Sequence, residues 1–308
     1  MDGFESHRDR LLGAAYRMLG SRAEAEDVVQ ETYLRWHQAD REAIRNPEAW
    51  LVTTATRLAI DRLRALRTER EGYVGPWLPE PLIGREPPSP DHHVQLASDL
   101  SMAFLVLLER LGPEERAAFL LHDVFDLGYP EIARALDKSE AACRQLVHRA
   151  RQRVREDRKR FEAPEAAKIR LLEAFSRALE TRDERALLGL FAPDATWTAD
   201  GGGRVPAGRR VIVGAERITK LLLGLGKSFY RGDVTRELVT INGEAGLLVR
   251  VDGRIRSTIS IATDGERILA GYTVVNPDKL PRLFPDGRLG NGEPISSGLL
   301  PGMENGKA

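Results

Sequence analysis

The sequence predicts a multidomain chain in which two all-α domains precede an α+β domain. Residues 4–66 and 94–162 carry apolar residues at helical spacing over successive segments. A proline-rich stretch, residues 72–91, separates these two helical parts. After residue 163, helices give way to alternating apolar runs separated by Asn-Gly, Asp-Gly and Asp-Gly, which are strong signals for β-hairpins. Helices followed by consecutive hairpins are typical of an α+β domain with an antiparallel sheet.

Length, charge and cysteine content limit the class of protein. A chain of 308 residues favours two or three domains. The 46 basic and 46 acidic residues cancel, which excludes a uniformly basic nucleic-acid coat protein and leaves DNA binding to local arginine clusters. The single cysteine excludes an internal disulfide framework and favours a reducing compartment. Because no apolar run has signal-peptide or membrane-span length, we expect a cytoplasmic protein without membrane association.

The first helical part divides at a Gly-Ser break. Ser21 and an acidic first turn predict a capped helix over the following residues. After a short loop, Asn46 and Pro47 predict the cap and first turn of a third helix. Apolar residues from Trp50 to Leu63 give that helix one buried face. Its outward residues are Arg57, Asp61, Arg62 and Arg64.

The linker contains an apolar motif, "WLPEPL", that starts at Trp77. Its prolines favour an extended conformation. An exposed Trp-Leu pair would leave apolar surface in water, so we expect the motif to dock on a folded surface; a merely exposed linker is the alternative.

The segment 129–155 changes from mildly acidic to densely basic. Two short helices with a polar Asp-Lys-Ser turn describe a helix-turn-helix, with Ala141, Leu146 and Val147 directed inward. An ordinary helical hairpin with solvated arginines is the alternative. Cys143 lies on the second helix, where we expect a packed thiol.

The C-terminal part offers few candidates for catalysis. Asp194, Asp200, Asp278 and Tyr272 are of the right type, but Asp194 is typical of a helix end, Asp200 of a turn and Asp278 of a loop. No catalytic set or metal-ligand spacing stands out, so we expect no enzyme activity, cofactor or metal. Residues 281–308 are rich in Gly, Pro and Asn and are expected to form a flexible tail.

The motifs "AEDVVQETYLRW", "NPEAWL", "LAIDRLR" and the run from "LGPEERAAF" to "VHRARQRV" resemble those of extracytoplasmic-function (ECF) sigma factors. Residues 163–280 are similar to a SnoaL-like domain, the ketosteroid-isomerase-type cone. "WLPEPL", "DGGGRV" and "NPDKL" resemble signatures of the sigma group that carries this fused extension. The resemblance implies sigma region 2 at 1–72, a linker at 73–93, the region 4 helix-turn-helix at 94–162, the cone at 163–280 and a tail at 281–308.

The resemblance also implies partners, namely core RNA polymerase and promoter DNA. Region 2 would meet polymerase through one polar helix face, for which a solvated face is the alternative. The arginine-rich third helix would approach the −10 element; Arg57 stands where many relatives carry asparagine, which leaves the preferred base open. The polymerase-facing residues are Asp27, Gln30, Glu31 and Arg35, and the −10 residues are Arg57, Asp61, Arg62 and Arg64.

In region 4, the helix from about Ser139 would enter the −35 major groove. Arg144, Gln145 and His148 can read base edges, although His148 can equally be a surface residue. Arg149 and Arg151 are expected to hold phosphates.

The implied function is promoter-specific transcription initiation, with the cone regulating activity in cis. An ordinary DNA-binding repressor and a cone-fold enzyme with a DNA-binding appendage are the alternatives, and a small-molecule ligand of the cone is left open. We expect the cone to hold the linker through contacts between two sets of residues. These are Trp77, Leu78, Pro79 and Pro81 in the linker, and Asn276, Pro277, Asp278, Lys279 and Leu280 after the last strand.

Overall fold

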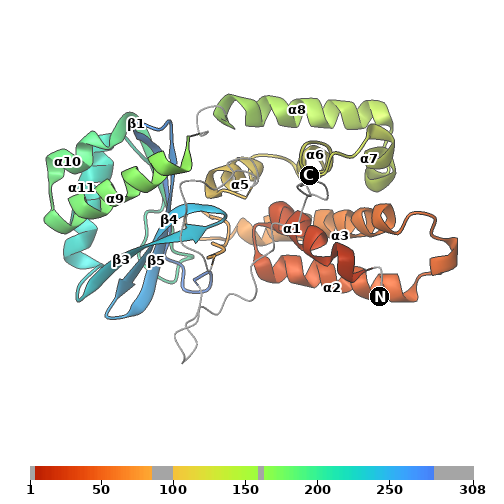
Figure 1. Ribbon diagram of the computed structural model, residues 1–308, viewed down its shortest axis with the longest axis horizontal. Helices are drawn as coiled ribbons and strands as arrows, with labels where there is room; N and C mark the ends of the chain where they lie inside the picture. The colour runs from red at the N-terminus through yellow and green to blue at the C-terminus, as the bar shows by residue number, and fades with distance from the viewer. Residues whose placement is uncertain (1–3, 85–99, 159–162, 281–308) are drawn as a thin grey trace, which may run out of the picture. The chain divides into compact units, whose positions relative to one another are not determined.

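The computed structural model describes residues 4–84, 100–158 and 163–280 (Figure 1). Within these residues the chain divides into two compact units. The first comprises residues 4–66 and 111–151, and the second comprises 67–84, 100–110, 152–158 and 163–280. The predicted tail and linker residues 85–93 lie outside the described residues.

The first unit begins with a short 3₁₀ turn, Glu5–His7, and three helices: α1 (Arg8–Leu19), α2 (Arg22–Gln38) and α3 (Pro47–Arg70). Helix α1 ends at Gly20, whose φ of 68° is left-handed, as the Gly-Ser break predicted. The Asn46 side chain accepts a hydrogen bond from the Ala49 N–H at 3.0 Å, which confirms the predicted cap of α3. Ser21 precedes α2, but its side chain makes no capping bond, so that part of the prediction is wrong.

The helix-turn-helix follows in the same unit. It consists of α7 (Tyr129–Leu136) and α8 (Glu140–Arg158), and the residues of α8 after 151 belong to the second unit. It is preceded by α6 (Pro113–Phe119) and a π-helical turn (Leu120–Val124). Asp137 has a φ of 53°, and this left-handed residue ends α7 and turns the chain toward α8. Cys143, Leu146 and Val147 are buried, as expected. Ala141 is exposed instead, because Ala150 completes the buried face of α8.

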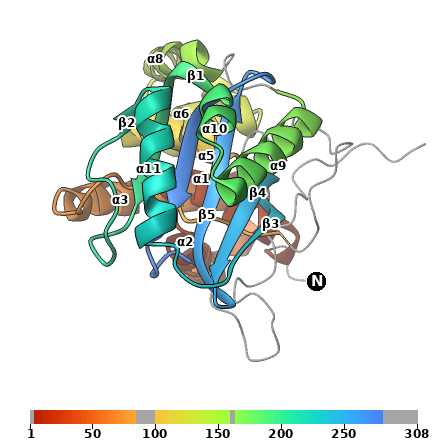
Figure 2. The same ribbon diagram turned by 90° about the vertical axis from the view of Figure 1, so that its left-hand side faces the viewer.

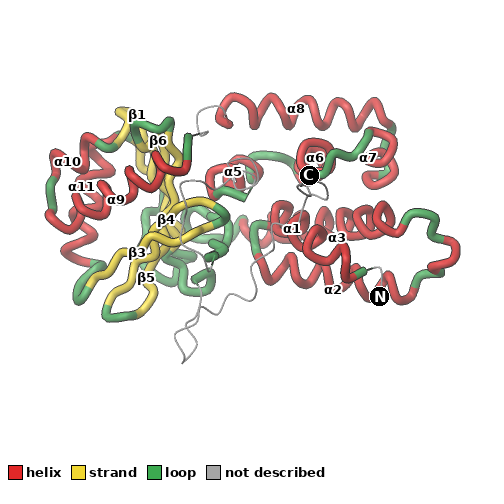
Figure 3. Tube along the Cα trace, in the orientation of Figure 1, coloured by secondary structure: helices red, strands yellow, loops and turns green. Residues whose placement is uncertain are grey.

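The second unit contains every strand that the structure describes (Figure 3). The strand order is β2-β1-β6-β5-β4-β3, and the neighbours β1 and β6 run parallel. The sheet is therefore mixed, and the prediction of a purely antiparallel sheet is wrong; β1 and β6 are far apart in sequence, so no hairpin fixes their relative direction. The strands are β1 (Phe191–Asp200), β2 (Ile212–Val213), β3 (Val234–Ile241), β4 (Glu244–Val251), β5 (Arg254–Thr263) and β6 (Ile268–Val274).

Two of the predicted hairpin turns have the expected backbone. Asn242 and Gly243 have φ values of 54° and 83°, and Asp252 and Gly253 have 50° and 75°. Two consecutive left-handed residues match the twist of the flanking strands. The Asn-Gly and Asp-Gly signals thus fix the β3-β4 and β4-β5 pairings.

Helices cover one face of this sheet: α9 (Glu165–Thr181), α10 (Glu184–Gly189) and α11 (Ala215–Ser228) (Figure 2). Phe175 of α9 stacks on Trp197 of β1, with ring centroids 5.7 Å apart, at the centre of that core. The opposite face packs against the linker and α5 (Met102–Leu108), through residues that include Leu78, Met102 and Ala270. The predicted region 4 includes the segment that forms α5; within the second unit, the apolar surface of α5 packs on strands β5 and β6.

Candidate functional site

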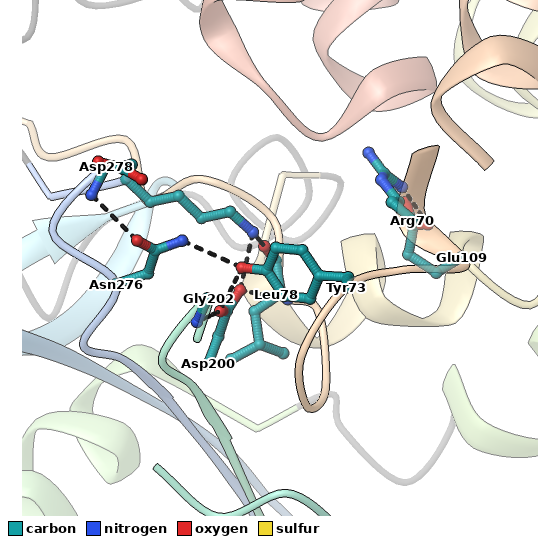
Figure 4. Close-up of polar contacts among 9 residues, drawn as sticks. Arg70, Tyr73, Leu78, Glu109, Asp200, Gly202, Asn276 and Asp278 are labelled. Carbon is teal, nitrogen blue, oxygen red and sulfur yellow. Dashed lines mark hydrogen bonds and ion pairs between the residues drawn. The ribbon is translucent and has the colours of Figure 1, made fainter. Parts of the chain in front are cut away.

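Asp200, the last residue of β1, binds the linker (Figure 4). Its Oδ1 accepts hydrogen bonds from the Tyr73 hydroxyl at 2.6 Å and from the Gly202 N–H at 3.0 Å. Its Oδ2 accepts from the Leu78 N–H at 2.8 Å and from Lys279 Nζ at 2.7 Å. The Asp200 side chain is completely buried. Each carboxylate oxygen therefore receives two donors, which compensates for its removal from water.

The glycines after Asp200 make this geometry feasible. Gly202 and Gly203 have φ values of 59° and 70°, a region that side chains other than glycine disfavour. A Cβ on Gly202 would also lie 2.2 Å from the Asn276 side-chain amide. The loop thereby brings the Asn276 Nδ2 close enough to donate to the Tyr73 hydroxyl at 3.0 Å. "DGGG" and "NPDK" consequently form one site with the linker.

Lys279 holds the same linker peptide from its other side. Its Nζ donates to the Leu78 carbonyl at 2.5 Å while it pairs with Asp200. Burial lowers the pKa of Lys279 to about 8, although the neighbouring Asp200 carboxylate opposes this shift. Burial also raises the pKa of Tyr73, and its hydrogen bond to Asp200 adds to the increase. The Leu78 peptide thus has both its N–H and its carbonyl bound by charged side chains.

Trp77 is half-buried and lies against two cations rather than in an apolar pocket. The Arg70 guanidinium carbon lies 3.4 Å from its ring centroid, and Lys279 Nζ lies 4.0 Å from it. Such contacts contribute about 0.5–2 kcal/mol each. Arg70 in turn pairs with Glu109 at 2.9 Å. The expected buried Trp-Leu pair is therefore wrong for Trp77, whose ring is held by cation–π contacts.

Leu78 supplies the apolar part of the docking. It is 1% exposed and packs in a cluster with Tyr272, Val274 and Leu280. Pro79 and Pro81 are buried as well. Pro277 and Asp278 are exposed; Asp278 pairs with Arg204 at 3.0 Å at the surface. The structure thus brings Asn276, Lys279 and Leu280 to the linker, whereas Pro277 and Asp278 have no described linker contact. The regulatory role of all these residues stays a prediction.

A second linker segment, absent from our expectations, lies along the edge of β3. Ile83 forms an antiparallel bridge with Ile241, and the Gly84 N–H donates to the Thr240 carbonyl at 2.8 Å. The Asn242 side chain accepts from the Leu82 N–H at 2.8 Å. Backbone pairing of this kind covers an otherwise open strand edge. The apolar pair Leu82-Ile83 in a proline-rich linker was the available sequence signal.

The candidate catalytic residues of the cone do not form a catalytic set. Asp194 lies within β1 rather than at a helix end. Asp200 ends that strand as a buried hydrogen-bond acceptor, so its interpretation as an ordinary turn residue is wrong. Tyr272 packs in the cluster that contains Leu78, on the face opposite the helices.

The predicted polymerase-facing residues lie on α2. Asp27, Gln30 and Arg35 are exposed, and Glu31 is half-buried and pairs with Arg35 at 2.9 Å. Leu34 is 46% exposed on the same surface. This face therefore combines charge with an exposed apolar side chain.

The residues expected to approach the −10 element already have partners within the first unit. Arg57 donates to the Ala135 and Arg134 carbonyls at 2.9 and 2.7 Å. These carbonyls lie in the last turn of α7, where a cation is favourable. Arg62 binds both carboxylate oxygens of Glu24 from its own domain. The remaining pairs join Arg64 to Asp61 and Glu114.

On the helix-turn-helix, Arg144, Gln145 and His148 are exposed together on α8. Arg144 also lies over the Tyr129 ring at 5.3 Å. Ser139 has a capping role here, because its hydroxyl accepts from the Ala142 N–H at 3.2 Å. The expected phosphate-binding residues form ion pairs, Arg149 with Glu115 and Arg151 with Asp123.

The described residues contain no group of His, Cys, Asp and Glu suited to a metal ion. No described helix combines the length and apolar character that crossing a membrane requires.

Comparison with known proteins agrees with this architecture. The family "Sigma-70 region 2" matches residues 4–69, and "Sigma-70, region 4" matches residues 101–154. The ECF RNA polymerase sigma factor SigJ of Mycobacterium tuberculosis is 38% identical over 287 residues, which cover 90% of this chain and 91% of SigJ. SigG of the same organism is 30% identical over 265 residues, which cover 78% of this chain and 70% of SigG.

A solved structure covers the cone as well. The crystal structure of M. tuberculosis SigJ superposes with a TM-score of 0.70 at 33% identity, covering 90% of this chain and 96% of that one. Two sigma-70 regions thus define the class as a transcription initiation factor. The chain belongs to the family of ECF RNA polymerase sigma factors. It carries the C-terminal SnoaL-like cone that the resemblance predicted.

Proposed function

We propose that this chain binds core RNA polymerase, directs it to promoters through −10 and −35 recognition, and is regulated in cis by its cone. The single observation that carries the regulatory part is the Leu78 peptide, bound at its N–H by Asp200 and at its carbonyl by Lys279. The linker is the segment that joins region 2 to region 4. Holding it on the cone restricts the spacing that the two regions can adopt on a promoter.

The contacts are strong enough to act as a switch. Burial of Leu78 contributes about 1.5–3 kcal/mol. Hydrogen bonds to charged groups add roughly 1.5–3 kcal/mol each. Moving a two-state equilibrium from 1:99 to 99:1 takes about 5.5 kcal/mol, so the docked linker can dominate in the free protein and be released by a competing partner.

For polymerase binding, the supporting observation is the exposed face of α2. It presents Asp27, Gln30 and Arg35 beside the apolar Leu34. Exposed charge around an apolar side chain is suited to a protein–protein interface, where the apolar centre is desolvated and the rim stays polar.

The test is promoter-directed transcription with purified core polymerase. The double variant Asp27→Ala, Glu31→Ala should bind core enzyme more weakly and yield less transcript. A matched double variant of two exposed cone carboxylates, Glu173→Ala and Glu184→Ala, should behave like wild type.

The same assay separates the alternatives. A repressor would bind its DNA without core polymerase and lower transcription when added. A cone-fold enzyme would leave transcription unchanged. Unaltered affinity of the α2 double variant for core enzyme would refute the assignment of this face.

A further inference from the structure

The cone contains a cavity between the helix-covered face of the sheet and α11. Its volume is about 340 Å³, which falls in the range of small-molecule sites. The lining is mainly apolar and includes Trp197, Leu222, Phe229, Val249 and Ile259. All of these residues belong to the second unit. A cavity of this size and character is suited to an apolar molecule.

The cavity wall carries two cations, the exposed Arg182 and the half-buried Arg236, and two hydroxyls that can donate hydrogen bonds, those of Tyr230 and Thr273. Thr273 is 6% exposed, and its Oγ1 has no hydrogen-bond partner within the described part of the chain. The Tyr230 hydroxyl contacts Ser257 Oγ at 2.8 Å, and the half-buried Arg236 lies close enough to interact electrostatically with it. The exposed Glu180 also faces Arg236. No carboxylate is among the described residues that line the cavity.

We call the contacts of Asp200, Asn276 and Lys279 with the linker the linker lock. The cavity and the linker lock lie on opposite sides of the ends of β1 and β6. Successive side chains on a strand point to opposite faces. Ala199 and Val275 line the cavity, whereas their neighbours Asp200 and Asn276 hold the linker. The alternation continues at Thr273, on the cavity side, and Val274, on the linker side. A single layer of backbone therefore separates the two sites.

We propose that this cavity binds an apolar molecule with one anionic group, and that its occupancy stabilises the docked linker. The anion would be held by Arg236 and the Tyr230 hydroxyl, and Thr273 would donate to a further oxygen. The coupling rests on the proposed cis regulation: a ligand that supports Ala199 and Val275 also fixes Asp200 and Asn276. Coupling between two sites is reciprocal, so docking would in turn tighten ligand binding.

Two fluorescent probes with one aromatic skeleton test the ligand class on the full chain. 8-Anilinonaphthalene-1-sulfonate carries an anion, and N-phenyl-1-naphthylamine is its neutral counterpart. One buried charge-assisted contact predicts roughly 10- to 100-fold tighter binding of the anionic probe. Arg236→Met should remove this preference and leave the affinity for the neutral probe unchanged. Equal affinity of the wild type for both probes would overturn the proposal.

Two glycines of α11 give a matched control for the location. Gly226 lines the cavity and Gly224 is exposed, and a Cβ at either position meets no atom within 4 Å. Gly226→Leu should weaken binding of both probes at least tenfold, and Gly224→Leu should leave it unchanged. Equal effects of the two variants would place the probe elsewhere and refute the site.

Coupling has its own readout, the hydrogen exchange of the Leu78 amide. Saturation with the anionic probe should slow this exchange, and unchanged exchange would refute the coupling. None of these measurements involves polymerase. A failed transcription assay would therefore count against the proposed function alone, and failed probe binding against this inference alone.

Discussion

Replacing Asp200 with asparagine should release the linker from the cone while keeping the size and shape of the side chain. The substitution keeps the size of the side chain but exchanges one carboxylate oxygen for an NH₂ donor. In the wild type, Oδ1 faces the Tyr73 hydroxyl and the Gly202 N–H, whereas Oδ2 faces the Leu78 N–H and Lys279. Either orientation of the amide therefore directs its NH₂ group at a backbone N–H that cannot accept, that of Gly202 or that of Leu78. Lys279 also loses its anionic partner.

The size of the effect follows from burial. Asp200 is completely buried and the Lys279 side chain is 13% exposed, so solvent screens this pair little. Removing one partner of a buried ion pair costs about 3–5 kcal/mol. At 1.4 kcal/mol per factor of ten, this corresponds to a shift of roughly 10²- to 10⁴-fold in the equilibrium between docked and released linker.

Hydrogen exchange of the Leu78 amide measures that shift, because this N–H is bound only while the linker is docked. Protection at Leu78 should fall by a factor in that range, and amides in the central strands β4 and β5 should keep theirs. The matched control is Asp278→Asn, which alters an exposed pair with Arg204 and should cost less than about 1 kcal/mol. Equal protection of Leu78 in wild type and Asp200→Asn would refute the reasoning.

Three further predictions concern other parts of the chain. Arg144→Ala should weaken the free energy of DNA binding by about 1–3 kcal/mol and relax specificity at one −35 base pair. Binding to a series of promoter variants measures this effect, and an equal loss of affinity on every sequence would identify a phosphate contact instead. Leu34→Ala should weaken core polymerase binding, measured by titration, whereas an unchanged affinity would exclude this side chain from the interface. The pKa of Lys279 should be about 8 by NMR titration. Because this pKa lies below the ordinary value of 10.5, the docked state binds fewer protons between these values, and docking should strengthen as pH rises through that window. An ordinary or raised pKa would show that pairing with Asp200 outweighs burial.

Local signals predicted the elements well. Pro47 begins a helix where expected, and the Asn-Gly and Asp-Gly pairs form left-handed hairpin turns. Helix starts and hairpin turns each depend on the backbone conformations of one or two residues, and the residue types at those positions predict these conformations. The parallel pairing of β1 with β6 joins strands far apart in the chain, and no local residue preference encodes it.

The linker site was only partly predictable for the same reason. The apolar Leu78 in a proline-rich segment indicated docking, and its burial agrees. Asp200 precedes three glycines, and glycine is typical of turns because it adopts positive φ without steric cost. The sequence therefore indicated a turn residue. Its function as the acceptor of four hydrogen bonds depends on Tyr73 and Lys279, which only the fold brings to it. Trp77 likewise looked like an apolar anchor; of the two cations beside its ring, Arg70 is close in the sequence and only Lys279 is brought there by the fold.

The central claim is that the cone controls a sigma factor through the docked linker. Its most direct test is transcript yield from one cognate promoter with purified core polymerase, for wild type, Asp200→Asn and Asp278→Asn at matched polymerase occupancy. If the docked linker controls activity, the transcript yield of Asp200→Asn should differ several-fold from wild type, and that of Asp278→Asn should equal wild type. Equal yields from all three proteins, together with a released linker in Asp200→Asn, would contradict regulation through the lock.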